Sequence, residues 1–345
     1  MRIVTVNHAI PSKRITNDEL LELICEHNRE ALDTRQLEHL TRKARQFMRQ
    51  AGTEVRFTLA DGEKAIDFGI RASKRALEAA RLAPGEIDFV IYSSVNRGWL
   101  EPATAAMVQS ELGIPEAASF DVVEACAGWL RAMQVAHSLI RGGTYRRGLI
   151  VNCECGLLRH QMDYRSGQEI AHRLASFTIG EAATATVVDD EVPEDDFYFR
   201  ILTYGKHFDL CMVPIDTVAD FAVNGSVDGR HRSLELFSRS KELISTTLKK
   251  IIEQFHADPN LKATSYDVGF GHAASTRASK ILLRKLGVPP GVFFDTHPRY
   301  GNTVSASVPL GISLALQEGR LRRGDRVLVV VGSAGISVGF ASFVF

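Results

Sequence analysis

The chain has 345 residues, of which 45% are hydrophobic and 24% are charged, so it can bury a large core in one large or two ordinary domains. Its 41 basic and 41 acidic residues give a formal net charge of zero, which does not favour nucleic acid or an anionic membrane as a partner. No apolar run reaches the length of a membrane span, and the start MRIVTVNHAIP indicates a strand rather than a signal peptide. These features predict a soluble globular protein of the cytoplasm.

The first half of the chain alternates strand patterns with helix patterns. Short apolar runs predict buried strands, and longer stretches with apolar residues at helical spacing predict helices. The predicted elements are a strand at 2–8, a long helical insertion at about 16–50, a helix at 63–81, a strand at 86–95, a helix at 103–112, a strand at 120–123, a helix from Cys126 to about Ile140, and strands at 147–154 and 179–188.

The second half begins after DDEVPEDD at 189–196, an acidic, proline-containing stretch that predicts a surface linker. The order of its predicted elements matches that of the first half. They are a strand at 197–204, a helix at 239–256, a strand at 265–271, a helix at 275–286, a strand at 292–295, a helix at 303–318, and strands at 325–332 and 336–345.

Local sequence also indicates a duplication. LGIP at 112–115 is followed by Phe120-Asp121, and LGVP at 286–289 is followed at the same spacing by Phe294-Asp295. A repeat of roughly 150 residues is far longer than a solenoid unit, so it indicates a duplicated domain. We expect residues 1–190 and 197–345 to form two halves with mostly parallel sheets covered by helices. Equivalent turns would then face each other across the junction.

Cys126 lies where a predicted strand gives way to a predicted helix. Unpaired backbone N–H groups and the helix dipole favour negative charge at such a helix start. We therefore expect the thiol to ionise more easily and to act as a nucleophile. The alternative is a small core side chain, since free cysteine is among the most buried residue types. The other cysteines are Cys25, Cys153, Cys155 and Cys211, and this odd total with irregular spacing suits neither a disulfide framework nor a zinc site.

Two further polar residues occupy related turns in the second half. The duplication matches the turn of Cys126 to PRYGNTVSAS, which contains Asn302, and it matches the end of the strand at 86–95 to His272. A thiol, an imidazole and a carboxamide converging at the junction would supply a nucleophile and two donors to the carbonyl oxygen of a second thioester. Taken separately, His272 could be a hydrogen-bonded strand-end residue and Asn302 a helix cap.

Three motifs carry a family resemblance. FDVVEACAGW, GHAAS and YGNTVSASVPLG, in this order, resemble motifs of the thiolase-like condensing enzymes, in particular the ketoacyl-ACP synthase III branch. The resemblance covers almost the whole chain and implies an α/β thiolase-like fold, an αβαβα sandwich of two similar halves. It also implies a homodimer and acyl transfer from acyl-CoA or acyl carrier protein onto Cys126, with His272 and Asn302 assisting condensation. A backbone amide near Ala334 would join that of Cys126 as the oxyanion hole, and a CoA or phosphopantetheine thioester would be a substrate rather than a bound cofactor.

Two positions depart from the pattern of initiating synthases. Ser275 stands where they tend to carry a second asparagine, and Glu101 in SSVNRGWLEPATA replaces an apolar residue in a loop that reaches the partner subunit's pocket. The head-to-head condensing enzymes of bacterial olefin synthesis have a similar LEP segment, in which the glutamate is the proposed base. Condensation without decarboxylation needs such a base, and an apolar pocket raises a carboxyl pKa toward the useful range. The alternative is an exposed acid just before Pro102, near a helix N-terminus.

Three functions remain open at this point. The first is a condensing enzyme of fatty acid, polyketide or related lipid biosynthesis that uses either a malonyl thioester or Claisen joining of two acyl thioesters. The second is plain acyl transfer to a hydroxyl or amine. The third is a non-catalytic partner subunit, against which the presence of all three candidate groups argues. The basic residues within 42–56 and 141–147 either meet an acidic carrier protein or CoA phosphates, or form ordinary solvated faces.

Overall fold

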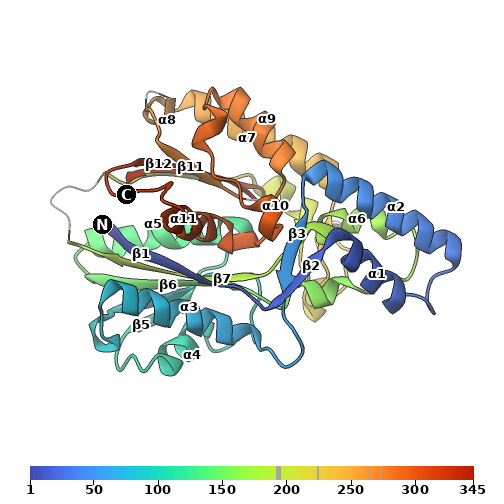
Figure 1. Cartoon of the computed structure of the whole chain (residues 1–345), viewed down its shortest axis with the longest axis horizontal. Coiled ribbons are helices and arrows are strands. Elements are labelled where there is room, and N and C mark those ends of the chain that lie inside the picture. Colours follow the sequence, from blue (N-terminus) through green and yellow to red (C-terminus); the bar gives the residue numbers. More distant parts are fainter. Residues whose placement is uncertain (192–195, 224, 263, 273) are drawn as a thin grey trace.

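The computed structural model describes residues 1–191, 196–223, 225–262, 264–272 and 274–345, so the middle of the predicted linker at 189–196 lies outside the described residues. Figure 1 shows five layers, in which two sheets separate three layers of helices. The predicted αβαβα sandwich is therefore confirmed. The outer helices are α3 (Ala65–Ala80) and α4 (Thr104–Glu111) on one side and α7 (Ser240–Ala257) and α9 (Thr276–Leu286) on the other, with α5 (Gly128–Arg141) and α11 (Ser307–Gln317) between the sheets.

The first sheet has five strands, and β4 pairs in parallel with both β5 and β6, whereas β7 pairs antiparallel with β6 and β1. The expectation of mostly parallel sheets is wrong, because the sheet is mixed. The order across it is β1 (Arg2–Ala9), β7 (Ala182–Asp189), β6 (Arg147–Glu154), β4 (Phe89–Tyr92) and β5 (Ala118–Asp121).

The second sheet has four strands in the order β11 (Val268–Gly271), β12 (Arg326–Ser333), β13 (Ser337–Val344) and β8 (Tyr198–Thr203). Only β11 and β12 are parallel, because the short turn between β12 and β13 forces an antiparallel hairpin. The predicted strand at 292–295 is wrong. Phe293 makes only an isolated parallel bridge to Gly269, at the sheet edge that corresponds to β5 in the first sheet. The chain then turns into the short helix that begins at His297.

The helical insertion at about 16–50 consists of two helices, α1 (Asn17–His27) and α2 (Thr34–Ala51). Each begins with a capping box, in which Thr16 pairs with Glu19 and Asp33 pairs with Gln36. In Figure 1 these helices lie beside the sandwich. The remaining short elements are β2 (Lys13–Thr16), β3 (Val55–Thr58), α6 (Ile170–Arg173), β9 (Cys211–Met212), β10 (Phe237–Ser238), α8 (Pro259–Lys262) and α10 (His297–Tyr300).

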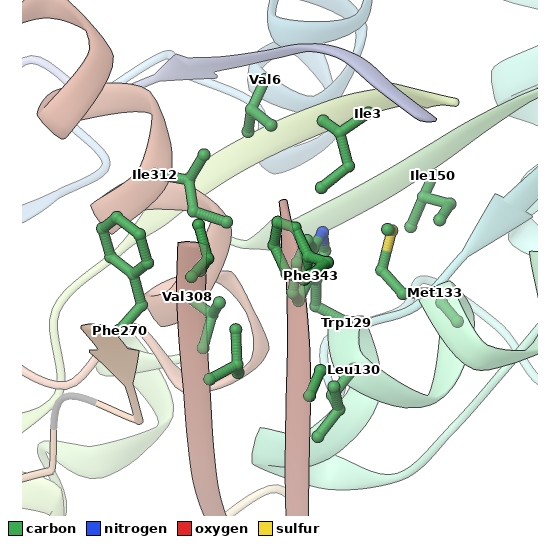
Figure 2. Close-up of a cluster of buried hydrophobic side chains, with 14 of the residues drawn as sticks. Ile3, Val6, Trp129, Leu130, Met133, Ile150, Phe270, Val308, Ile312 and Phe343 are labelled. Atoms are coloured by element: carbon green, nitrogen blue, oxygen red, sulfur yellow. The ribbon is translucent and has the colours of Figure 1, made fainter. Parts of the chain in front are cut away.

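The largest hydrophobic cluster fills the space between the two sheets. Figure 2 shows Val6 of β1, Trp129 of α5, Ile312 of α11 and Phe343 of β13 gathered there. Burying each such side chain contributes about 1.5–3 kcal/mol, and the indole Nε1 of Trp129 donates to Thr186 Oγ1 at 3.0 Å, so it is not left unpaired. The packing holds the starts of α5 and α11 in fixed positions at the junction of the halves.

The five cysteines are free. Within the residues that the structure describes, no group of three or more His, Cys, Asp or Glu side chains comes together as a metal site would require. None of the helices in the same residues is both long and apolar enough to cross a membrane.

Candidate active site

A cavity of about 730 Å³ lies where the two halves meet, and its wall contains Cys126 from the first half and His272, Asn302 and Ala334 from the second. The structure thus brings together the sequence-distant groups that were predicted to converge. Glu101 does not line this cavity. Most of the wall is apolar and is built by α7, α9 and the segment after β9, including Leu243, Ile244, Leu248, Ile251, Leu282, Leu283, Leu286, Ile215, Val218 and Phe221.

Two equivalent turns lead into the two central helices. Cys126 lies in a one-turn 3₁₀ helix, Ala125–Ala127, directly before α5, and Val304–Ala306 forms the same turn directly before α11. Ala125 has φ 44° and Val304 has φ 49°, a left-handed conformation that costs residues with a side chain about 1–3 kcal/mol. Within the predicted counterpart segment PRYGNTVSAS, this match makes Ser305 the structural counterpart of Cys126, a residue that the sequence reasoning did not single out.

The Cys126 side chain faces the cavity rather than open solvent. Burial raises the pKa of its thiol well above the ordinary value, and the nearby Cys211 and Glu154 raise it further. The direction of this shift is opposite to the expected easy ionisation, because α5 begins only at Gly128 and desolvation outweighs the effect of the helix start. The thiol is protonated at neutral pH, so attack on a substrate requires a group that accepts its proton.

His272 directly follows β11, as predicted. Burial lowers the pKa of its imidazole to about 4, and His297 adds to the lowering. Its Nδ1 lies 3.5 Å from the hydroxyl of Ser307 at the start of α11. The ring is therefore neutral at pH 7 and can either accept or donate a proton.

Asn302 lies just before the second turn and is held by its own backbone and side chain. Its N–H donates to Thr178 O at 2.7 Å, and its Oδ1 accepts from Val304 N at 3.0 Å. The side chain thus closes a short turn onto the backbone two residues further on, but it does not cap the helical turn at Val304–Ala306 or α11, as the sequence alternative had it. Since Oδ1 is occupied, the group that Asn302 can offer to a substrate is its Nδ2 donor. Ser275 lines the same cavity and caps α9 by accepting from Ala278 N at 3.2 Å.

Glu101 lies on an exposed loop between β4 and α4. Its neighbours Trp99 and Leu100 are 40% and 72% exposed, and the Trp99 indole donates to Pro102 O at 2.7 Å. Because Glu101 is outside the cavity of its own chain, it can act as a base only in a site to which another chain contributes. The loop presents two large apolar side chains to solvent, which is typical of an interface.

The two basic segments, considered either as docking regions or as ordinary solvated faces, are partly occupied by structural contacts. Arg56 is fully buried and donates to Phe177 O. Arg146 pairs with Asp190, and Arg147 pairs with acidic side chains at 3.1–3.2 Å. These residues are therefore poor candidates for docking.

A basic groove lies between α2 and α9 and combines Arg49, from the segment 42–56 considered above, with cations of α9 that the sequence reasoning missed. It is lined by Arg49 of α2 and by Arg277, Lys280 and Arg284 of α9. The signal in the sequence was the helical spacing of the three α9 cations, but their pairing with α2 depends on the fold. Ser279 and Leu282 of α9 line the large cavity, so the groove and the cavity lie on different faces of the same helix.

Comparison with known proteins agrees with this architecture. Family models described as 3-oxoacyl-[acyl-carrier-protein (ACP)] synthase III and its C-terminal part match residues 120–205 and 257–345. A β-ketoacyl-[acyl-carrier-protein] synthase III of Rhizorhabdus wittichii is 26% identical over 347 residues, covering 99% of this chain and 98% of the relative. The corresponding protein of Sphingopyxis alaskensis is 28% identical over 337 residues, covering 96% and 95%.

Solved structures show the same fold. OleA of Xanthomonas campestris, with bound lauric acid and lauroyl-CoA, has a TM-score of 0.82 and 21% identity, covering 99% of this chain and 98% of that one. The 3-oxoacyl-[acyl-carrier-protein] synthase III of Aquifex aeolicus has a TM-score of 0.81 and 22% identity, covering 100% and 99%. Fold and sequence together define a thiolase-like, acyl-transferring condensing enzyme. The chain belongs to the 3-oxoacyl-[acyl-carrier-protein] synthase III family.

Proposed function

We propose that this chain takes an acyl group from an acyl-CoA or acyl-carrier-protein thioester onto Cys126 and joins it to a second thioester by forming a C–C bond. The observation that supports this proposal is the single cavity lined by Cys126, His272 and Asn302. Its volume of about 730 Å³ falls within the range of small-molecule sites, about 300–1,000 Å³. Its apolar wall suits an acyl chain, and the similar OleA structure contains lauric acid and lauroyl-CoA.

In the first step the sulfur of Cys126 attacks the thioester carbonyl carbon, the bond from that carbon to the carrier sulfur breaks, and the carrier thiol leaves with a proton. Because burial raises the pKa of the Cys126 thiol, its proton must be accepted during attack, and the neutral ring of His272 is the candidate acceptor. The backbone amides of Cys126 and Ala334 are the proposed donors to the oxyanion that forms.

In the second step the α-carbanion of another thioester attacks the acyl carbonyl carbon on Cys126. The new C–C bond forms, the acyl–sulfur bond breaks, and the cysteine recovers a proton. While the second thioester carries negative charge, its carbonyl oxygen needs hydrogen-bond donors. A neutral His272 and the Nδ2 group of Asn302 are the proposed donors.

Glu101 is the proposed base that forms the carbanion. We propose a homodimer in which the exposed loop of one subunit enters the cavity of the other, so that Glu101 removes a proton α to the second thioester. This route joins two acyl thioesters without loss of CO₂. The alternative is decarboxylation of a malonyl thioester, in which loss of CO₂ generates the carbanion and no base is needed.

The thioester carrier carries negative charge in both proposed forms, either as CoA phosphates or as an acidic carrier protein. The groove of Arg49, Arg277, Lys280 and Arg284 shares helix α9 with the wall of the cavity. It is the proposed docking surface, since guanidinium groups bind phosphates and carboxylates in pairs of hydrogen bonds.

The test is to incubate the protein with acyl-CoAs of graded chain length, measure its intact mass, and analyse products with and without malonyl-CoA. An acyl mass increase together with a 3-oxo product that forms without malonyl-CoA would support Claisen joining of two acyl thioesters. A product only with malonyl-CoA supports decarboxylative condensation. Acylation without either product favours transfer to a hydroxyl or amine, and no mass increase with any acyl-CoA or acyl carrier protein rejects the proposal.

A further inference from the structure

The ends of the two equivalent central strands supply polar groups to the site region. β6 and β12 each have eight residues, and they end at Glu154 and Ser333 respectively. Each strand lies inside its sheet, and both side chains are buried, with 0% and 4% exposure. By their position in the duplicated fold, these two residues are counterparts.

Ser333, in the second half, holds the turn of the first half. Its hydroxyl donates to Glu124 O at 3.0 Å and accepts from Ala127 N at 3.2 Å. These two groups lie on either side of Cys126 along the chain. The hydroxyl therefore fixes the short turn that presents the thiol to the cavity.

Glu154, in the first half, holds the turn of the second half. The hydroxyl of Ser305 donates to Glu154 Oε1 at 2.6 Å. The same carboxyl group accepts from Val95 N at 3.0 Å and from Asn96 N at 3.3 Å, in the loop that follows β4. It thus joins the turn after Asn302 to the loop that leads to the exposed Trp99–Glu101 segment.

We propose that Glu154 and Ser333 are reciprocal positioning residues, each ending a central strand of one half and locking the turn of the other half. Neither residue forms bonds with the substrate in this proposal. A buried carboxyl group is costly unless donors surround it, and its three donors come from two elements that must stay aligned. A hydroxyl suffices at Ser333, because the side chain there accepts one hydrogen bond and donates one.

The assignment of steps rests on the proposed function. Ser333 fixes the turn of the nucleophile, so its loss should slow acylation of Cys126. Glu154 fixes the turn that follows Asn302, so its loss should slow condensation. It should not slow acylation, because Glu154 raises the pKa of the Cys126 thiol and its removal acts in the opposite direction. Each substitution removes a buried hydrogen bond, and we expect it to lower the rate of the affected step at least about tenfold.

The experiment compares Ser333→Ala, Glu154→Gln and the control Ser73→Ala. Ser73 is equally buried, but its hydroxyl donates to Gly69 O within α3, far from the cavity. Acylation is followed by intact mass after rapid mixing with an acyl-CoA. Condensation is followed by adding the second thioester to protein that is already acylated.

The proposal predicts a crossed pattern, in which Ser333→Ala slows only acylation and Glu154→Gln slows only condensation, while Ser73→Ala slows neither. Equal slowing of both steps by both variants, or no change in either, would overturn it. A loss of rate that only parallels a lower melting temperature of the variants would also overturn the proposal.

Hydrogen–deuterium exchange provides a test that does not depend on activity. In Ser333→Ala the amide of Ala127 should exchange faster, because it keeps only its bond to Glu124 O at 2.9 Å. In Glu154→Gln one of the two amides of Val95 and Asn96 should exchange faster, because a glutamine can accept at only one of the two oxygen positions. Faster exchange at the same segment in both variants, or at neither segment, would contradict reciprocal locking. A wild-type protein that forms no acyl-enzyme would reject the proposed function but leave this exchange result decisive.

Discussion

The two halves of the molecule place different side chains at equivalent positions. Cys126 of the first half corresponds to Ser305 of the second. Ser93 corresponds to His272, since their backbone amides donate to Val151 O of β6 and to Val330 O of the equivalent strand β12. Each turn before a central helix faces the strand end of the other half. One such diagonal pair, Cys126 and His272, therefore consists of a thiol and an imidazole, and the other, Ser305 and Ser93, consists of two serines.

The serine pair shows how closely these positions approach across the junction. Ser305 Oγ lies 3.0 Å from Ser93 O, and Asn152 Nδ2 lies 3.1 Å from Ser305 Oγ. By the symmetry of the fold, the turns of Cys126 and His272 face each other in the same way, but both of these residues line the cavity. The duplication thus provides two matched junctions, one of which is closed by hydrogen bonds and one of which is open to substrate.

Replacing the thiol should have the largest effect. Cys126→Ser should abolish the acyl mass increase, because a serine hydroxyl in this apolar surrounding is a far weaker nucleophile. Cys211→Ser is the matched control, since Cys211 lines the same cavity but lies outside the turn. Acyl label that persists in Cys126→Ser, or disappears in Cys211→Ser, would show that the wrong sulfur has been assigned.

The exposed loop offers the next test. Glu101→Ala should stop Claisen joining and spare acylation if the carboxylate is the base. Mixing Glu101→Ala and Cys126→Ser chains should restore condensation, because a mixed dimer would contain one site with both groups. Product analysis of the two chains apart and mixed provides the measurement, and the absence of restoration after confirmed subunit exchange would exclude a base supplied by the partner.

A residue of the open site and a residue of the closed junction should also differ in what they contribute. Asn302→Ala should slow condensation about 10²-fold or more by removing a donor to the developing oxyanion. Ser93→Ala removes a hydroxyl that donates to Val122 O at 2.8 Å, so it should lower the free energy of unfolding by about 1 kcal/mol and leave turnover within about threefold. Single-turnover kinetics and urea unfolding distinguish the two outcomes, and equal kinetic losses would contradict the division.

Gly128, at the start of α5, tests how tightly the closed junction is packed. A Cβ there would lie 2.7 Å from Ser93 Oγ and 3.3 Å from Ser305 Cβ. Gly128→Ala should therefore destabilise the fold by about 1–3 kcal/mol through overpacking. The control is Gly85→Ala, where the nearest atom would lie at 3.8 Å. Similar melting temperatures for both variants would show that the junction is looser than described.

The smallest expected effect concerns pH. Burial lowers the pKa of His272 to about 4, whereas an unfolded histidine titrates near 6.5. Between these values the unfolded chain binds more protons, so stability should fall as the pH falls from about 6.5 to 4. His272→Asn should lose less stability between pH 7 and pH 5 than the wild type does in urea unfolding. An equal or larger loss in the variant would place the titrating group elsewhere.

Much of this fold could be predicted, because alternating strand and helix patterns are strong local signals and the duplication checks each half against the other. β6 was predicted at the bounds that the structure gives, 147–154. The segment from 204 to 238 could not be predicted, because its strands β9 and β10 have two residues each and short 3₁₀ turns carry no clear period.

The site was predicted as a set of residues but not as an environment. Cys126, His272 and Asn302 follow from their places beside predicted strands and helices. The raised pKa of the thiol could not be foreseen, because it depends on burial beneath segments distant in sequence. The roles inferred for Glu154 and Ser333 likewise arise only where the halves pack together.

The most direct test of the account is a chase with isolated acyl-enzyme. Wild-type protein acylated at Cys126 and freed of donor is mixed with a second thioester, and protein mass and products are followed together. We predict that the protein returns to its unmodified mass as one equivalent of a C–C-joined product that contains the original acyl carbons appears. Return to the unmodified mass with only free acid or an unjoined acyl product, or a stable acyl-enzyme with both thioester classes, would contradict it.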